Sequence, residues 1–310
     1  MVNMPLPAMN RITRRTLPML AFAPFVRAAD PIKRLRLGGP IFLNSQDPVE
    51  LAREHRRLGY RAAYCPAMAT LDDTTRLAAI VKAYAAEDVV IAEVGAWRNM
   101  LDADPNTRRA NLDYVSQRLA LAEAIGARNC VDIAGSFHPK LWDGPDPRNY
   151  SKQFFDATVE NCRKVIDAVK PKRTKFTIEM MPWAPPDGPD AYLQLLRAVD
   201  REGFGVHIDV CNIVNSPQRY FQNGALIEEC FQKLGRLIMS CHAKDIGPTR
   251  VHLAEMIPGR GGLDYRAYLR SIARYAPDAP LMLEHLDGPA QYEEGKRHIQ
   301  SVATEIGLSF

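Results

Sequence analysis

The sequence predicts an α/β protein in which residues 29–310 fold as a single (β/α)8 TIM barrel. The chain has 310 residues, of which 46% are hydrophobic and 25% charged, an ordinary globular balance with enough length for one large core. From residue 34 onwards, short apolar runs alternate eight times with helix-like segments, and such alternation indicates a parallel sheet. A closed barrel needs roughly 250 residues, so the length favours one barrel over two small domains.

The predicted strands are apolar runs bounded by glycine, proline or polar residues. An open, doubly wound sheet is the alternative, and it usually has a glycine-rich turn after its first strand. Here Gly38, Gly39 and Pro40 have the wrong spacing for that turn and include a proline. In chain order, the predicted strands cover residues 34–43, 62–66, 89–97, 129–134, 175–181, 206–210, 237–242 and 281–286.

The predicted helices follow the strands and have their own start and stop signals. Asp47 is a predicted N-cap with Pro48 in the first turn, and Gly59 ends the same helix. The segment 107–125 has apolar residues at i, i+3 and i+4 spacing and ends before Gly126. The helices are predicted at residues 48–58, 71–87, 107–125, 151–169, 191–201, 225–234, 265–275 and 291–306, with long loops at 135–150 and 244–262.

Residues 1–28 are predicted to be an export signal that is cleaved from the barrel domain. Arg14 and Arg15 precede an apolar stretch, and Val26 and Ala28 lie at positions −3 and −1 of a cleavage site. The paired arginines and the modest hydrophobicity resemble a twin-arginine signal, which predicts a periplasmic or secreted protein. The alternatives are a basic tail or a misassigned start.

The basic balance of the chain comes from this N-terminal segment. It holds Arg11, Arg14, Arg15 and Arg27 and no acidic residue, so it accounts for the whole formal net charge of +4. The remaining chain is neutral, which argues against nucleic acid as a partner. The apolar stretch is also too short for a permanent membrane span, and no other segment approaches that length. We therefore expect neither nucleic-acid binding nor stable membrane insertion.

Four metal-competent side chains, Glu179, Asp209, His242 and Glu284, lie in or directly after the apolar runs of the last four predicted strands. A charged residue in such a run is costly to bury unless it is paired or bound to a metal, and three acids brought together would repel one another without a cation. The set suits one divalent ion, with Mn²⁺ as first choice and Mg²⁺, Co²⁺ or Zn²⁺ as alternatives. In a barrel, all four would meet at the C-terminal mouth, where barrel enzymes have their active sites.

Several strings around these residues are similar to a known group of proteins. They are residues 177–179 (Thr-Ile-Glu), 242–245 (His-Ala-Lys-Asp), 258–261 (Pro-Gly-Arg-Gly) and 263–265 (Leu-Asp-Tyr). Together they resemble the xylose isomerase-like superfamily, in particular its sugar isomerase and epimerase branch, over roughly residues 34–306. The 242–245 and 258–261 strings at this spacing are the distinctive part of the resemblance.

The resemblance implies a metal-dependent enzyme in which Glu179 and Glu284 are both metal ligands and the acid/base pair. In the related epimerases these two glutamates flank the substrate from opposite faces. A bound cation stabilises the enediolate that forms when a carbon next to a carbonyl loses its proton. One position departs from the pattern: many members have a histidine three residues after the strand-six Asp, where this chain has Asn212. Because asparagine does not titrate near neutral pH, this change leaves the exact reaction open.

Further residues are predicted to surround a sugar substrate. Tryptophan rings offer stacking surfaces, and Lys244 either neutralises an oxyanion or pairs with Asp245. His207 is two residues before Asp209 and is expected one layer deeper on the same side, whereas His285 is expected to point away from Glu284. The predicted substrate-binding residues are Asn212, Trp97, Trp183, His138, Lys244, His252 and Arg260.

The sequence thus favours an isomerase or epimerase that acts on a non-phosphorylated sugar or keto-sugar. A homo-oligomer is compatible with this expectation. Export argues against sugar phosphates, which are mainly cytosolic. The close alternative is a metal-dependent lyase or dehydratase that performs β-elimination on a keto-sugar or 3-keto-glycoside. Two further alternatives are a non-catalytic sugar-binding barrel and an apurinic endonuclease-like enzyme, although the latter uses a richer histidine cluster and a basic face for phosphates.

Overall fold

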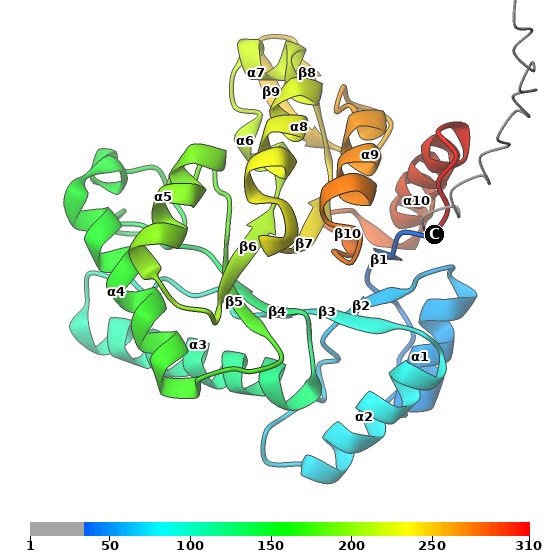
Figure 1. Cartoon of the computed structure of the whole chain (residues 1–310), viewed down its shortest axis with the longest axis horizontal. Coiled ribbons are helices and arrows are strands. Elements are labelled where there is room, and N and C mark those ends of the chain that lie inside the picture. The colour runs from blue at the N-terminus through cyan, green and yellow to red at the C-terminus, as the bar shows by residue number, and fades with distance from the viewer. Residues whose placement is uncertain (1–33) are drawn as a thin grey trace, which may run out of the picture. The chain divides into compact units, whose positions relative to one another are not determined.

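A computed structural model describes residues 34–310, in which eight parallel strands close into a barrel (Figure 1). This architecture confirms the predicted single (β/α)8 TIM barrel. The predicted export signal lies outside the described residues. The barrel strands are β1 (Leu37–Gly38), β2 (Ala62–Tyr64), β3 (Val90–Gly95), β4 (Asn129–Asp132), β5 (Lys175–Glu179), β6 (Phe204–Ile208), β7 (Ile238–Ala243) and β10 (Leu281–Leu283), and their order around the ring is β1-β10-β7-β6-β5-β4-β3-β2.

Helices follow the strands and lie around the ring (Figure 1). Asp47 caps the first of them by accepting the N–H of Val49, as its position before a proline predicts. Within residues 34–310, no helix combines the length and apolarity needed to cross a bilayer. The helices are α1 (Pro48–Arg57), α2 (Thr74–Ala86), α3 (Pro105–Ile125), α4 (Lys152–Val169), α5 (Pro189–Val199), α6 (Val210–Ile213), α7 (Pro217–Phe221), α8 (Asn223–Leu234), α9 (Tyr265–Tyr275) and α10 (Gly288–Glu305), with 3₁₀ turns η1 (Pro147–Tyr150) and η2 (Gly235–Leu237).

The segments that differ from the sequence prediction include the first strand and the second long loop. The predicted first strand, residues 34–43, pairs in the barrel only at β1, because the chain leaves the ring before Pro40. The predicted long loop 244–262 contains an antiparallel hairpin of β8 (Asp245–Thr249) and β9 (His252–Met256). Its first strand includes Gly247 and Pro248, which weaken a strand signal but are tolerated in a two-stranded ribbon that has only edges.

A polar layer crosses the barrel interior. The side-chain amide of Asn129 on β4 donates to the hydroxyl of Thr177 on β5 at 2.8 Å, and Ser240 on β7 donates to Asn129 at 3.2 Å. Glu179 and His242 follow Thr177 and Ser240 by two residues on the same strands. Since side chains alternate along a strand, these two residues also point inward, one layer nearer the mouth.

The end of β4 holds a buried acid, Asp132, whose environment favours its neutral form. One carboxylate oxygen accepts the N–H groups of Arg98 and Ile133 at 2.9 Å, and the other is buried with no hydrogen-bond partner among the described residues. Burial raises the pKa of Asp132 to about 8, although the two N–H groups oppose this rise. The folded protein therefore keeps a proton on Asp132 at pH values where the unfolded chain has lost it.

Asp132→Asn is expected to gain stability relative to the wild type as the pH rises. The folded-state pKa lies above the unfolded value of about 3.9. Between about pH 4 and pH 8, Asp132 therefore ionises in the unfolded chain but not in the folded protein, and the free energy of unfolding falls progressively as the pH rises. Asparagine cannot ionise, so the difference in unfolding free energy should grow by up to about 1.4 kcal/mol per pH unit over that range. Urea unfolding of both proteins at several pH values measures it, and a difference that does not change with pH would contradict the prediction.

Candidate metal centre

The ends of four neighbouring strands bring the predicted ligands together. Glu179 is the last residue of β5, Asp209 directly follows β6, His242 lies in β7, and Glu284 directly follows β10. One ligand atom from each residue lies within 4.8 Å of all the others. Glu179, Asp209 and His242 are buried, and the Glu284 side chain is 13% exposed. The four therefore form one cluster at the C-terminal mouth of the barrel.

His242 is at the centre of this cluster. Its Nδ1 lies 2.9 Å from Oε1 of Glu284, 3.1 Å from Oε1 of Glu179 and 3.5 Å from Oδ2 of Asp209. Burial opposes the charged imidazolium, but the surrounding carboxylates raise the pKa of His242 well above its usual value. Three acids thus face one ring nitrogen, which is the arrangement expected of ligands that share one ion.

Lys244 supplies a second positive charge. Its buried Nζ lies 2.7 Å from Oδ2 of Asp209 and 2.7 Å from Oε1 of Glu284. Burial alone would raise the pKa values of these two acids, but Lys244 and His242 together hold both below their usual range. Burial raises the pKa of Glu179, and the charges of Glu284 and Asp209 add to the rise while His242 opposes it. Glu179 is therefore the carboxylate in this cluster that most readily holds a proton.

The donor set fits a divalent ion. Three carboxylates and one imidazole nitrogen are ligands that Mn²⁺, Co²⁺ and Zn²⁺ accept, and Mg²⁺ accepts the oxygens. Oδ2 of Asp209 and Oε1 of Glu284 are buried and, among the described residues, have no hydrogen bond of good geometry, although cationic nitrogens lie close to them. Such buried oxygens leave lone pairs available for a metal ion.

Asn212, the position that departs from the resemblance, contacts the cluster directly. Asp209 accepts the N–H of Asn212 and so begins the short helix α6. The side-chain amide of Asn212 donates to Oε1 of Glu179 at 3.1 Å and to the carbonyl of Met180 at 3.0 Å, and its oxygen lies 3.4 Å from Nζ of Lys244. Asn212 therefore holds Glu179 in place and connects it to Lys244.

A further acid, Glu93 on β3, was not among the predicted site residues. It is 1% exposed, and its two oxygens lie 3.2 Å from Nε2 of His207 and 3.2 Å from Nε2 of His242. His207 is fully buried and shares Glu93 with His242, so it lies beside the cluster. Glu93 carries the same sequence signal as the other acids, because it is a single charge inside an apolar run.

A cavity of about 780 Å³ opens above the cluster. Glu179, Glu284 and Asn212 contribute to its wall, together with the predicted stacking residues Trp97 and Trp183. The volume is in the usual range for a small-molecule site. The other lining residues are Pro40, Tyr64, Ile133, Leu141, Trp142, Asp143, Gly144, Pro145, Met181, Pro182, Glu255, His285 and Tyr292.

Three predicted substrate-binding residues lie elsewhere. His138 accepts the N–H groups of Lys140 and Leu141 through Nδ1 and so shapes its own loop. His252 is exposed on β9, and Arg260 is exposed and pairs with Glu294 at 2.5 Å. None of the three is among the described residues that line the cavity, and Lys244, which pairs with the cluster, is not among them either.

His285 lies at the cavity rim, although the sequence predicted that it points away from Glu284. Strand β10 ends at Leu283, so the alternation of a strand does not extend to His285, whose φ of 55° turns its side chain. Its Nδ1 lies 3.1 Å from Oε2 of Glu255, and its Nε2 lies 3.7 Å from Oε2 of Glu284. His285 therefore faces the site, and the prediction that it has a purely structural role is wrong.

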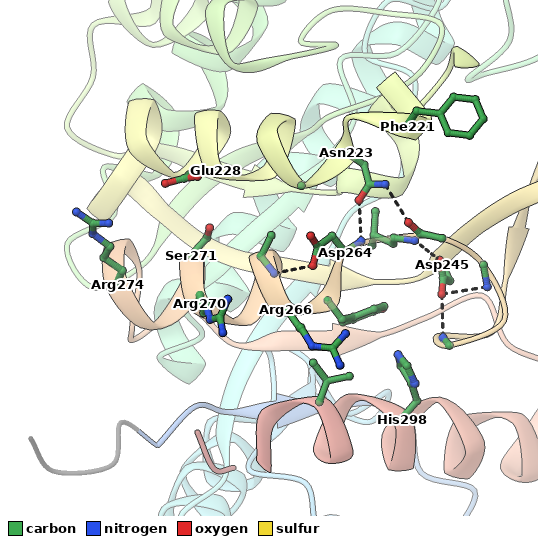
Figure 2. A pocket seen from close by; sticks show the side chains of 18 of the residues that line it. Phe221, Asn223, Glu228, Asp245, Asp264, Arg266, Arg270, Ser271, Arg274 and His298 are labelled. Atoms are coloured by element: carbon green, nitrogen blue, oxygen red, sulfur yellow. Dashed lines mark hydrogen bonds between the residues drawn. The ribbon is translucent and has the colours of Figure 1, made fainter. Parts of the chain in front are cut away.

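Asp245 connects the two distinctive strings of the sequence (Figure 2). Its carboxylate accepts the backbone N–H groups of Gly259, Gly261 and Leu263 at 2.8, 3.2 and 2.9 Å. A Cβ atom on Gly261 would collide with this carboxylate, which explains the glycine. Asp245 thus anchors the segment after β9, while its neighbour Lys244 pairs with the cluster.

Comparison with known proteins agrees with this architecture. The model of the xylose isomerase-like TIM barrel family matches residues 49–302. Among solved structures, a 3-keto-D-glucoside 4-epimerase from E. coli has a TM-score of 0.63 and 12% identity over 86% of this chain and 100% of its own. Endonuclease IV from Thermus thermophilus has a TM-score of 0.65 and 14% identity over 87% and 99%. A probable 3-DHS dehydratase from Bacillus anthracis has a TM-score of 0.62 and 14% identity over 86% and 98%.

These three structures share the fold with this chain and differ from one another in activity. At such low identities the likeness concerns the fold alone. No curated protein matches the sequence. The family model, in contrast, covers most of the chain, and the fold it describes is the one observed. The chain belongs to the xylose isomerase-like TIM barrel family.

Proposed function

We propose that this protein is a divalent-metal-dependent isomerase or epimerase acting on a non-phosphorylated sugar or keto-sugar. The observation that carries the proposal is the position of Glu179 and Glu284. Both acids belong to the cluster that fits a metal ion, both line the cavity, and they come from strands that two others, β6 and β7, separate in the ring. Two carboxylates at different points around one substrate site suit removal of a proton from one face and its return to the other.

In this proposal each residue of the site has its own role. Glu179 removes the proton from the carbon next to the carbonyl, and Asn212 orients its carboxylate through the 3.1 Å hydrogen bond. Glu284 returns a proton from its own side of the cavity. Trp97 and Trp183 in the cavity wall offer apolar ring faces to a sugar. A divalent ion held by Glu179, Asp209, His242 and Glu284 would polarise the carbonyl and so acidify the adjacent C–H bond.

The charge of the cavity supports a substrate without phosphate. Among the described residues that line it there is no arginine or lysine, whereas Asp143, Glu179, Glu255 and Glu284 are all acidic. Phosphate recognition usually relies on arginine, lysine or helix N-termini. A neutral sugar therefore suits this wall better than a sugar phosphate.

One observation favours β-elimination on a 3-keto-glycoside as a second candidate. Trp142 and Trp183 line the cavity and are 42% and 54% exposed, so the apolar wall extends outwards from the metal cluster. This outer wall offers a place for the aglycone of a glycoside. The first step is again removal of a proton next to a carbonyl, after which the C–O bond in the β position breaks and the aglycone leaves with the electron pair.

Metal analysis and deuterium exchange test both candidates together. The purified protein is expected to bind one divalent ion per chain and to lose activity with a chelator and regain it with Mn²⁺. In D₂O, the metal-loaded protein should introduce deuterium next to the carbonyl of a free ketose or of a 3-keto-glycoside, and the chelated protein is the control. A new sugar isomer indicates epimerisation, and a released aglycone indicates elimination. A metal-loaded protein that exchanges no proton in either substrate class would refute the proposal.

A further inference from the structure

A second buried cluster lies directly behind the proposed metal centre. Glu93, His207 and His242 come from β3, β6 and β7, and none of them is more than 1% exposed. The two carboxylate oxygens of Glu93 each lie 3.2 Å from one Nε2 atom, one on His207 and the other on His242. The rings of His207 and His242 pack edge to face, with centroids 4.2 Å apart. His242 belongs to both clusters, and His207 is also the strand-pairing partner of Glu179.

The geometry fixes which nitrogen of His242 is available to a metal. An ionised carboxylate only accepts hydrogen bonds, so the Nε2 atom facing Glu93 must carry a hydrogen. A neutral imidazole has one protonated nitrogen, which leaves the lone pair on Nδ1. Nδ1 is the atom that faces Glu179, Asp209 and Glu284. Glu93 therefore selects the form of His242 that can bind a cation at the mouth.

We infer that Glu93, held by His207, is a positioning residue that makes this site prefer transition-metal ions over Mg²⁺. The inference rests on the metal centre proposed above. A carboxylate that accepts the second N–H of a ligating imidazole makes the imidazole a stronger donor. Imidazole binds the later transition-metal ions such as Co²⁺ and Zn²⁺ well, whereas Mg²⁺ prefers oxygen ligands and retains its waters. The Glu93 contact thus strengthens the one ligand on which the two classes of ion differ most.

The same three residues also satisfy the distances of a second metal site. That assignment would require His242 to bind ions through both ring nitrogens. It would also replace two hydrogen bonds that already satisfy both oxygens of Glu93. A positioning role uses the observed contacts as they are, and it predicts one bound ion per chain rather than two.

His207 acts through Glu93. Its Nε2 is the donor for Oε1 of Glu93, and its own Nδ1 is buried with no hydrogen-bond partner among the described residues. In the neutral ring this Nδ1 is an acceptor, and burying it without a partner costs desolvation energy, which the hydrogen bond from Nε2 to Glu93 offsets. Replacing His207 should therefore matter for metal binding only while Glu93 is present.

Dissociation constants for Co²⁺ and Mg²⁺, measured by competition with a fluorescent chelator, test this inference. Glu93→Leu is expected to weaken Co²⁺ binding by about 10- to 100-fold and Mg²⁺ binding much less. Glu93→Gln keeps one acceptor and should give an intermediate loss of Co²⁺ affinity. This variant tests the inference if the leucine variant does not fold. As a single substitution, His207→Phe should weaken Co²⁺ binding. Combined with Glu93→Leu or Glu93→Gln, it should cause no further loss.

Ser240→Ala is the matched control, because it removes a buried hydrogen bond from the neighbouring layer and should leave the Co²⁺ to Mg²⁺ ratio unchanged. Equal losses for both ions in the Glu93 variants would show general distortion and overturn the inference. Unchanged affinities, or two ions per wild-type chain, would overturn it as well. A wild-type protein that binds no divalent ion would instead remove the metal centre itself, so the two failures are distinguishable.

Discussion

Glu284→Gln is expected to stop the proposed epimerisation while the barrel stays folded. Glutamine has nearly the same shape, but it cannot accept a proton from carbon, and it removes the negative charge that lies 2.7 Å from Nζ of Lys244 and 2.9 Å from Nδ1 of His242. Loss of a general acid or base costs about 10² to 10⁴ in rate, and the weakened metal binding adds to this loss. Turnover should therefore fall by at least that factor, measured at a saturating Mn²⁺ concentration with the bound metal determined in the same sample.

Deuterium exchange separates the proton-transfer role of Glu284 from its role as a ligand. With two bases, each epimer loses its proton to a different glutamate, so metal-loaded Glu284→Gln and Glu179→Gln should each still exchange one epimer in D₂O, and not the same one. Glu160→Gln is a matched control, since Glu160 pairs with Lys164 on α4, away from the barrel mouth. Wild-type turnover in either active-site variant would contradict the assignment, and identical exchange in both variants would argue for a single base.

The four residues of the proposed metal centre could be picked out from the sequence because each interrupts an apolar run with a charge that burial would penalise. The strands then had to meet in one ring, and length and alternation were sufficient to predict that ring. Glu93 has the same signal in the third run, but its partners, His207 and His242, are more than 100 positions away in the chain. Nothing local indicates such a contact, so its place behind the metal site became visible only in three dimensions.

Local rules failed where a strand ended. The alternation of β10 predicted that His285 faces away from Glu284, but the strand ends two residues earlier and a positive φ turns the side chain back to the site. The sequence predicts a loop after β7, where the structure has a hairpin whose first strand contains Gly247 and Pro248, both poor strand formers. Both errors concern the C-terminal mouth, where the backbone departs from regular geometry to build the cavity.

The pairing of Lys244 could not be predicted from the sequence either, and replacing this residue is expected to have the second large effect. The sequence left open whether it pairs with the adjacent Asp245 or serves the site. In the structure the carboxylate of Asp245 binds backbone N–H groups, and Lys244 is buried between Asp209 and Glu284. The ammonium group thus neutralises two of the proposed metal ligands. A metal ion would supply the same compensation, so Lys244 and the metal should partly replace each other in stabilising the fold.

Lys244→Met is therefore expected to make the stability of the protein depend on metal. Removing one partner of a buried ion pair costs about 3–5 kcal/mol, and here it leaves Asp209 and Glu284 without their nearest cation. In a chelator, urea unfolding should show a loss of this size. Saturating Mn²⁺ should restore most of it, because an ion that binds only the folded state stabilises it through its binding free energy.

Lys296→Met provides the comparison that isolates the effect of the site. Lys296 is also largely buried, but its Nζ donates to the carbonyl of Leu58 and pairs with Glu293, neither of which belongs to the cluster. Its loss should destabilise the protein equally with and without Mn²⁺. If Lys244→Met loses the same unfolding free energy with chelator and with Mn²⁺, Lys244 and the metal do not compensate the same carboxylates. If the deficit disappears with Mn²⁺, linkage requires that the variant bind the ion more tightly than the wild type, by up to about 100-fold for 3 kcal/mol.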